Sequence, residues 1–213
     1  MFNFFFSKDI HKTIMLDLST CNKKKASSYG KIYISAYHNA SEEMKIALQK
    51  TCFQHLTETL LKVHRTSLEL SKHGQNMLAI LEVWHSERKK RNFEFITMLT
   101  DAYEPILWKY LKSGFNVHRC NAADVFFKAF PLERPGGNVM EAERLFNEQY
   151  STMAALLIDD CHIVRIIAVR VSSFWLDKIF FKKWEMYKKN FCRKFAIFCL
   201  ITGTNLILVK FKN

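Results

Sequence analysis

The sequence predicts an all-α fold in which antiparallel helix pairs stack one after another as a superhelix. Hydrophobic residues make up 49% of the 213 positions, which is enough for the chain to bury a sizeable core. Six glycines and three prolines are too few to punctuate a fold of many strands, so helices are expected throughout. A third observation, a short pattern that occurs twice, indicates how the helices are organised.

The repeated pattern is a polar turn, then Arg-x-x-Ala, then an apolar run. Its members are Arg119 and Ala122 after the turn at 112–114, and Arg165 and Ala168 after Asp159 and Asp160. The two arginines stand 46 residues apart. Helical repeats of the HEAT and armadillo classes have periods of about 40 to 47 residues. The spacing therefore predicts a HEAT-repeat α-solenoid, which is a scaffold architecture and not an enzyme fold.

The recurring residues have a structural interpretation. An arginine at the start of the second helix of a pair can reach carbonyls and carboxylates of adjacent turns, and a small alanine one turn later lets two helices approach closely. Asp159 and Asp160 suit a helix N-terminus and could pair with Arg165 or with Arg119. We assign all of these residues to the framework and none of them to catalysis.

The first half of the chain predicts an irregular start followed by amphipathic helices. Residues 7–30 are polar and rich in lysine, and they predict a loop or an irregular arm. Over 32–64 apolar residues recur every three to five positions, which predicts a helix or a helix pair with Ser41 as an N-terminal cap. His73-Gly74-Gln75 interrupts this pattern, and a short apolar helix follows over 77–84.

The second half predicts two further helix pairs. A polar turn at 88–91 precedes a long helix over 93–111, which Pro105 should bend or break. The remaining predicted elements are helices over 116–130, 140–157 and 162–176, with a loop at 131–137 between the first two and a turn at 159–160 between the others.

The net charge of +12 is concentrated at the two ends of the sequence. Residues 178–213 carry +8 and residues 1–29 carry +3, which leaves +1 for residues 30–177. The charge alone therefore gives no argument for DNA binding by the repeats. We divide the chain into a polar N-terminal arm (1–29), a helical block (30–177) and a divergent, basic and then apolar tail (178–213).

Two lysine-rich stretches have both a functional and a plain interpretation. If the repeats touch DNA, the first candidates are the residues of one predicted turn, namely Arg88, Lys89, Lys90 and Arg91. A solvated polar turn would have the same composition. Residues 23–25 similarly fit either a localisation signal or a solvated loop.

The tail is open to three interpretations. It is basic with interspersed aromatic residues up to Lys194 and largely apolar over 195–209. It could be a sequence foreign to the rest of a truncated gene product, a short membrane anchor or a nucleic-acid-binding arm. The apolar run is shorter than the roughly 20 residues that a spanning helix needs, which disfavours the membrane anchor.

No residue pattern indicates an enzyme, a cofactor or a metal site. The stretch at 135–137 follows no strand and precedes no Lys-Ser or Lys-Thr pair, so it is not expected to be a phosphate loop. The six cysteines form no Cys-x-x-Cys pair and are expected to be buried free thiols in a reducing compartment. A nuclear or cytoplasmic location follows.

Longer motifs resemble a known family. They are Pro105-Ile106-Leu107-Trp108, Asn121-Ala122-Ala123, Ala129-Phe130-Pro131, Phe146-Asn147-Glu148-Gln149-Tyr150 and Ile163-Val164-Arg165. At these spacings the chain resembles, over about residues 30–177, the G subunit of condensin II, a HEAT-repeat subunit that is not itself an SMC protein. Members of that family are several times longer than this chain.

The resemblance implies a function and a set of partners. In the family, a kleisin subunit bridges two SMC ATPases, and two HEAT-repeat subunits dock on the kleisin to engage DNA during mitotic chromosome assembly. The G subunit has no catalytic activity. The resemblance thus implies a nuclear, chromosome-associated scaffold with kleisin, SMC and possible DNA partners. The alternative is a small helical protein attached to a membrane by its C-terminal tail.

Overall fold

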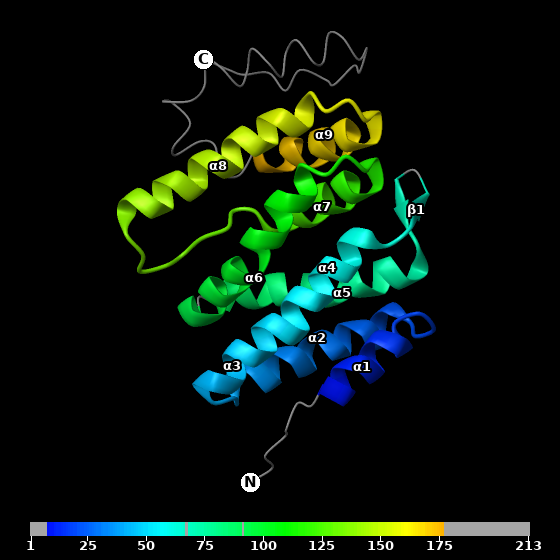
Figure 1. Ribbon diagram of the computed structural model, residues 1–213, viewed down its shortest axis with the longest axis vertical. Helices are drawn as coiled ribbons and strands as arrows, with labels where there is room; N and C mark the ends of the chain where they lie inside the picture. The colour runs from blue at the N-terminus through cyan, green and yellow to red at the C-terminus, as the bar shows by residue number, and fades with distance from the viewer. Residues whose placement is uncertain (1–7, 67, 91, 177–213) are drawn as a thin grey trace. The chain divides into compact units, whose positions relative to one another are not determined.

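The computed structural model describes residues 8–66, 68–90 and 92–176, which are mostly helical, as predicted (Figure 1). The chain divides into two compact units, Met1–Asn147 and Glu148–Asn213. The helices are α1 (Lys8–Asp17), α2 (Lys23–His38), α3 (Glu42–Leu48), α4 (Gln54–Lys62), α5 (Lys72–Glu87), α6 (Phe93–Leu111), α7 (Asn116–Ala129), α8 (Val139–Leu157) and α9 (His162–Leu176).

Shorter elements connect some of these helices. The π-helical segment η1 (Gln49–Phe53) joins α3 to α4, and the 3₁₀ turn η2 (Arg88–Lys90) follows α5. Two strands of two residues each, β1 (Arg65–Thr66) and β2 (Glu69–Leu70), pair antiparallel with Arg65 opposite Leu70. The sequence pattern gave no prediction of this hairpin, because strands this short have no measurable periodicity.

The helices from α6 onward begin and end within one residue of their predicted bounds. The side chain of Asn92 accepts a hydrogen bond from the backbone N–H of Phe95 and so caps α6. Phe130 has extended backbone angles because it precedes Pro131, and this ends α7. Of the two effects expected of Pro105, a bend or a break, the break does not occur, since α6 continues through it to Leu111.

The prediction of a loop or irregular arm over residues 7–30 is also wrong. Helix α1 occupies 8–17, and α2 begins at Lys23, with the Asn22 side chain accepting a hydrogen bond from the backbone N–H of Lys25. The buried residues of the two helices recur at helical spacing: His11 and Ile14 on α1, and Ala26, Gly30, Tyr33, Ile34 and Tyr37 on α2. The lysines lie on the exposed face and make the composition of this stretch polar. The helical spacing of its buried residues was therefore not recognised in the sequence.

The predicted break at His73-Gly74-Gln75 is the first turn of α5. Ser71 caps this helix by accepting a hydrogen bond from the backbone N–H of Gly74. A Cβ at position 74 would lie 2.7 Å from Val63 Cγ1, so glycine is needed for close packing and not as a helix breaker. Gly30 has the same role between α2 and α5, because its Cβ would lie 2.8 Å from Val83 Cβ.

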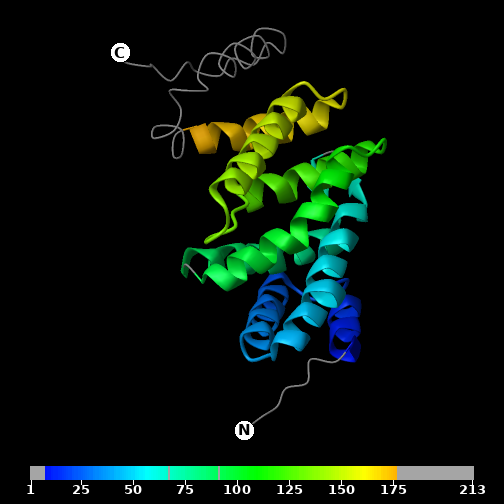
Figure 2. The same cartoon turned by 60° about the vertical axis from the view of Figure 1, so that its left-hand side comes forward.

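Buried aromatic side chains form the centre of the first unit. The rings of Phe53 in η1 and Trp84 in α5 have centroids 4.4 Å apart, and Tyr33 in α2 meets Trp84 edge-on at 5.6 Å. Phe95 of α6 packs against Phe53 from another side, at 6.2 Å. Helix α4 packs beside α6, as the two views show (Figures 1 and 2). The core therefore joins segments that are far apart in the sequence.

Candidate functional site

The first copy of the predicted repeat motif forms a closed hydrogen-bonded turn between α6 and α7. Arg119 reaches back from the first turn of α7, and its Nη1 donates to the carbonyl oxygens of Ser113, at 2.8 Å, and Gly114, at 3.4 Å. The hydroxyl of Ser113 accepts a hydrogen bond from the backbone N–H of Phe115 at 3.2 Å. The arginine thus fastens its own helix to the turn that leads into it.

The second copy, between α8 and α9, repeats the arginine-to-carbonyl contacts of the first. Arg165 Nη1 donates to the carbonyl oxygens of Asp159, at 2.6 Å, and Asp160, at 3.0 Å. The Asp159 carboxylate accepts from the backbone N–H of Cys161 at 2.8 Å. In both copies the arginine binds the carbonyls five and six residues before it. Arg165 thus meets these two residues through their main-chain oxygens. Pairing of its charge with their carboxylates stays a prediction.

The alanines of the motif are buried in both copies, and their role in close helix approach stays a prediction. Ala122 and Ala168 are both fully buried, three residues after their arginines. Cys120, Cys161 and the other cysteines of the described residues, Cys21 and Cys52, are buried free thiols, as expected. Cys192 and Cys199 lie outside the described residues. The motif is thus a packing and turn-closing unit in both copies.

Replacing either motif arginine by alanine should lower the free energy of unfolding by a similar amount. Each change removes two hydrogen bonds from a charged donor to main-chain carbonyls, one of them partly buried, and Arg119→Ala also removes the bond from Nη2 to Asn116 Oδ1. We expect a loss of about 1 to 2 kcal/mol in each case. Urea denaturation of Arg119→Ala and Arg165→Ala measures it. Lys112→Ala, an exposed residue in the same turn as Arg119, is the control and should change stability by less than about 0.5 kcal/mol. A neutral result for both arginine variants would contradict the turn-closing role.

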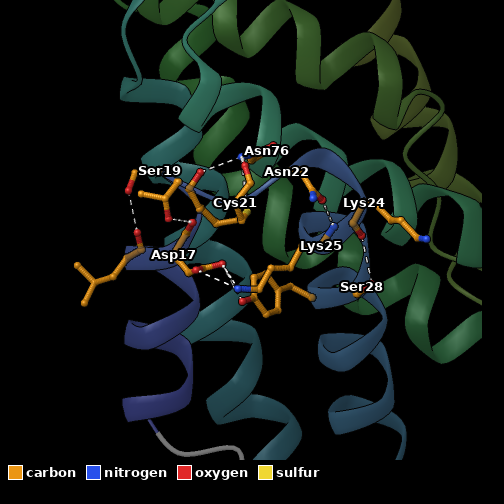
Figure 3. A network of polar contacts seen from close by, with 12 residues as sticks. Asp17, Ser19, Cys21, Asn22, Lys24, Lys25, Ser28 and Asn76 are labelled. Carbon is orange, nitrogen blue, oxygen red and sulfur yellow. Dashed lines mark hydrogen bonds and ion pairs between the residues drawn. The ribbon is translucent and has the colours of Figure 1, made fainter.

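Two buried asparagines, which the sequence analysis missed, hold the ends of other helices. Asn76 of α5 donates from Nδ2 to the carbonyl oxygens of Leu18 and Cys21, both at 2.9 Å, just beyond the end of α1 (Figure 3). Asn121 of α7 donates to the carbonyl of Val63 at 2.8 Å, just beyond the end of α4, and more weakly to those of Leu60 and Leu61. Helix C-termini leave carbonyls unpaired, and a buried end needs such a donor.

The spacing of these asparagines was a signal available in the sequence. They stand 45 residues apart, close to the period of the arginines, and Asn121 lies only two residues after Arg119. A single asparagine in an apolar stretch has many interpretations, whereas two at the repeat spacing indicate a repeated role. The same helix thus presents one residue to its own turn and another to the end of an earlier helix.

The second asparagine, Asn121, accepts a hydrogen bond from a buried charged side chain. The Arg65 side chain on β1 is 2% exposed, and its Nε donates to Asn121 Oδ1 at 2.9 Å. The guanidinium also forms an ion pair with Asp124 of α7. The hairpin therefore places a cation against α7, and no local sequence pattern predicts this contact across more than fifty residues.

The structure separates the four candidates for DNA contact at 88–91. Both terminal nitrogens of Arg88 donate to main-chain carbonyls, of Ala129 and of Pro131, so this arginine holds the end of α7 and the following loop. Lys90 pairs with Glu87 at 2.8 Å, and Lys89 is exposed. Arg91 lies outside the described residues. DNA contact by this turn stays a prediction, carried by its exposed lysines.

Two histidines of the first unit, the buried His11 and the half-buried His85, hydrogen-bond to tyrosines. His11 of α1 lies 2.7 Å from the Tyr33 hydroxyl and 2.8 Å from His55, and His85 of α5 lies 2.9 Å from the Tyr103 hydroxyl. Burial, and secondly His55, lowers the pKa of His11 to about 4. Burial, and secondly Arg88, lowers the pKa of His85 to about 3. Both side chains are therefore neutral parts of the core near pH 7.

Neither a metal centre nor a membrane-spanning helix is found in the described ranges. No group of three or more His, Cys, Asp or Glu side chains is assembled for a metal ion there. Among the same residues, every helix is too short or too polar to cross a bilayer. The polar contacts gathered at the motif positions tie helices to turns and to one another.

The described residues thus form a mostly helical protein in which a helix–turn–helix arrangement with an arginine-closed turn occurs twice. It belongs to the family described as the Condensin II non structural maintenance of chromosomes subunit, whose model matches residues 1–134. This match includes residues 1–29, which the resemblance noted in the sequence did not reach.

The curated relatives agree with the family match. The chain is 30% identical over 184 residues to the human Condensin-2 complex subunit G2, which covers 86% of this chain and 15% of that protein. It is 31% identical over 164 residues to the subunit of the same name in Danio rerio, covering 77% of this chain and 14% of that protein. The chain thus spans about 15% of the length of the curated relatives that it matches. No solved structure matches the chain significantly.

Proposed function

We propose that this chain is a non-catalytic scaffold module of condensin II that acts in mitotic chromosome condensation. The observation that carries the proposal is the family match over residues 1–134. The arrangement of the motif residues agrees with it, because the paired arginines and asparagines form a framework that holds helices in register. A framework of this kind offers its exposed helix faces to partners.

The proposed architecture is a HEAT-repeat solenoid with α6–α7 and α8–α9 as successive helix pairs. The like closure of the two turns by Arg119 and Arg165 supports this assignment, as does their 46-residue spacing. We assign the α5 segment to an earlier pair that keeps the asparagine, Asn76, but has Gly74 in place of the motif arginine.

The proposed partners follow from the family. We propose that the chain contacts the kleisin subunit and, through it, the two SMC ATPases, at chromosomes in the nucleus. DNA contact through the exposed Lys89 and Lys90 is a subsidiary proposal. A membrane location has no support among the described helices, none of which could cross a bilayer.

Co-purification tests the proposal. The full chain, co-expressed with the condensin II kleisin and the remaining subunits, should retain the kleisin through affinity and size-exclusion steps. A form lacking residues 178–213 should retain it equally, since the family match ends well before that tail. Failure of both forms to bind would mean that the chain has the family's helices without its assembly. Binding by the full form alone would mean that kleisin binding requires residues 178–213.

A further inference from the structure

An open groove of about 350 Å³ lies between α3–η1 and the N-terminal half of α6. Ile46 and Gln49 form part of one wall, and Phe93, Glu94 and Met98 form part of the other. All the lining residues belong to the first compact unit. The groove is formed by two helices that meet through the core below it, so its walls are fixed by packing.

The groove leaves large apolar side chains in water. Ile46 is 55% exposed and Phe93 is 61% exposed, whereas Phe95, two residues further along α6, is fully buried. Covering this surface would gain about 25 cal/mol for each Å² of apolar area removed from water. Exposed apolar residues that line a concave surface with polar groups at its rim are typical of binding sites.

The polar rim of the groove exposes carboxylates, and the lysine side chain between them is more covered than they are. Lys45 binds Glu42 at 2.8 Å and Glu94 at 2.6 Å, and it lies over the ring of Tyr37. Its side chain is only 15% exposed, while those of Glu42 and Glu94 are 83% and 53% exposed. Solvent therefore meets the negative partners of these ion pairs.

Further acidic residues lie beside the rim, on α6 and at the start of α8. Arg134 lies within 2.8 Å of Asp101 and within 2.6 Å of Glu104 and Glu141. Around the groove and its border the carboxylates outnumber the cations: Glu42, Glu94, Asp101, Glu104 and Glu141 face Lys45, Arg134 and Arg144. This face is acidic in a chain whose net charge is +12. Nucleic acid would be repelled here, whereas a basic protein segment would be attracted.

We propose that this groove binds a short basic and apolar segment of a partner protein. A lysine or arginine of the segment would pair with the outward-facing carboxylates of Glu42, Glu94 and Asp101. A neighbouring apolar side chain would cover Ile46 and Phe93. The proposal deepens the scaffold function and rests on it only for the identity of the partner, because the chemistry of the groove is independent of that assignment.

Fluorescence anisotropy with a defined probe tests the groove. The probe is a short synthetic peptide of alternating lysine and phenylalanine, titrated with the full chain at low salt. A variant with Glu42→Gln, Glu94→Gln and Asp101→Asn should bind it at least about tenfold more weakly, because three attractive charges are removed. A matched variant that neutralises three exposed carboxylates outside the groove, Asp9→Asn, Glu69→Gln and Glu143→Gln, should bind within about twofold of the parent.

A second variant addresses the apolar part of the site. Phe93→Ser changes an exposed side chain, so the fold should be retained, and it should weaken the probe about fivefold or more while leaving the charges in place. If the groove variant and the control variant weaken probe binding equally, the effect depends on net charge alone and the proposal is overturned. Displacement of the probe by duplex DNA that itself binds the groove would overturn it too. None of these measurements uses another condensin subunit, so this inference and the proposed function fail separately.

Discussion

Replacing Asn121 by alanine should lower the free energy of unfolding by about 3 kcal/mol or more. The change leaves the carbonyl oxygens at the end of α4 without their buried donor. It also removes the acceptor of Arg65 Nε, so that a charged group that is 2% exposed loses a partner. An unsatisfied buried polar group costs about 1 to 3 kcal/mol, and a buried charge more. Urea or thermal denaturation monitored by circular dichroism measures the effect.

Asn76→Ala is the matched comparison for this prediction. Asn76 also donates to two carbonyls at a helix end, but no arginine hydrogen bond to it is found in the described residues. Its replacement should therefore cost less, about 1 to 2 kcal/mol, and the difference between the variants measures the contribution of Arg65. Equal losses for the two variants would show that Arg65 adds nothing. A loss below about 0.5 kcal/mol for Asn121→Ala would contradict the helix-end role altogether.

Acidification should destabilise the first unit well above the pH at which its carboxylates are protonated. Burial holds the pKa of His11 at about 4 and that of His85 at about 3, below the ordinary value of 6.5. Below pH 6.5 the unfolded chain therefore binds more protons than the folded chain. The stability from these neutral histidines is complete above pH 6.5 and is lost as the pH falls toward their folded pKa values. At pH 5 each histidine should lower the free energy of unfolding by about 2 kcal/mol, and the two together by about 4 kcal/mol.

Substitutions assign this effect to the two histidines. Urea denaturation at pH 7.5 and at pH 5 should show a smaller difference in His11→Gln and in His85→Gln, by about 2 kcal/mol each. His64→Gln, at an exposed position, should keep the difference seen in the parent chain. A parent chain whose free energy of unfolding is the same at both pH values would contradict the prediction.

The helices of the second half could be predicted because local chemistry determines them. Pro131 ends α7 through the restricted backbone of the residue before it, and the turns at 112–114 and 159–160 are closed by arginines only five and six residues away. Such contacts are contained in a short window of sequence. The bounds of α6, α7, α8 and α9 were therefore correct within one residue.

The N-terminal helices and the break at Gly74 could not be predicted in this way. Helices α1 and α2 have many lysines, and their buried residues become informative only when the elements that cover them are known. Helix α5 packs against α2, and His11 of α1 contacts Tyr33 and His55. The stretch His73-Gly74-Gln75 has the composition of a turn. The absence of a side chain at Gly74 in fact makes room for Val63, which is eleven residues away in the sequence. Packing against a distant element decided both cases.

The candidate sites also include some contacts between neighbours along the chain and others between distant segments. The sequence alone predicted the helical class, and it placed Arg119 and Arg165 beside the turns that they contact, because these features depend on neighbours along the chain. Only the tertiary structure decided that Asn121 and Arg65 hold the end of α4 and that Arg88 binds main-chain carbonyls. It also brought α3 and α6 together to form the acidic groove. These contacts join residues forty to sixty positions apart, and the folded core alone sets which of them meet.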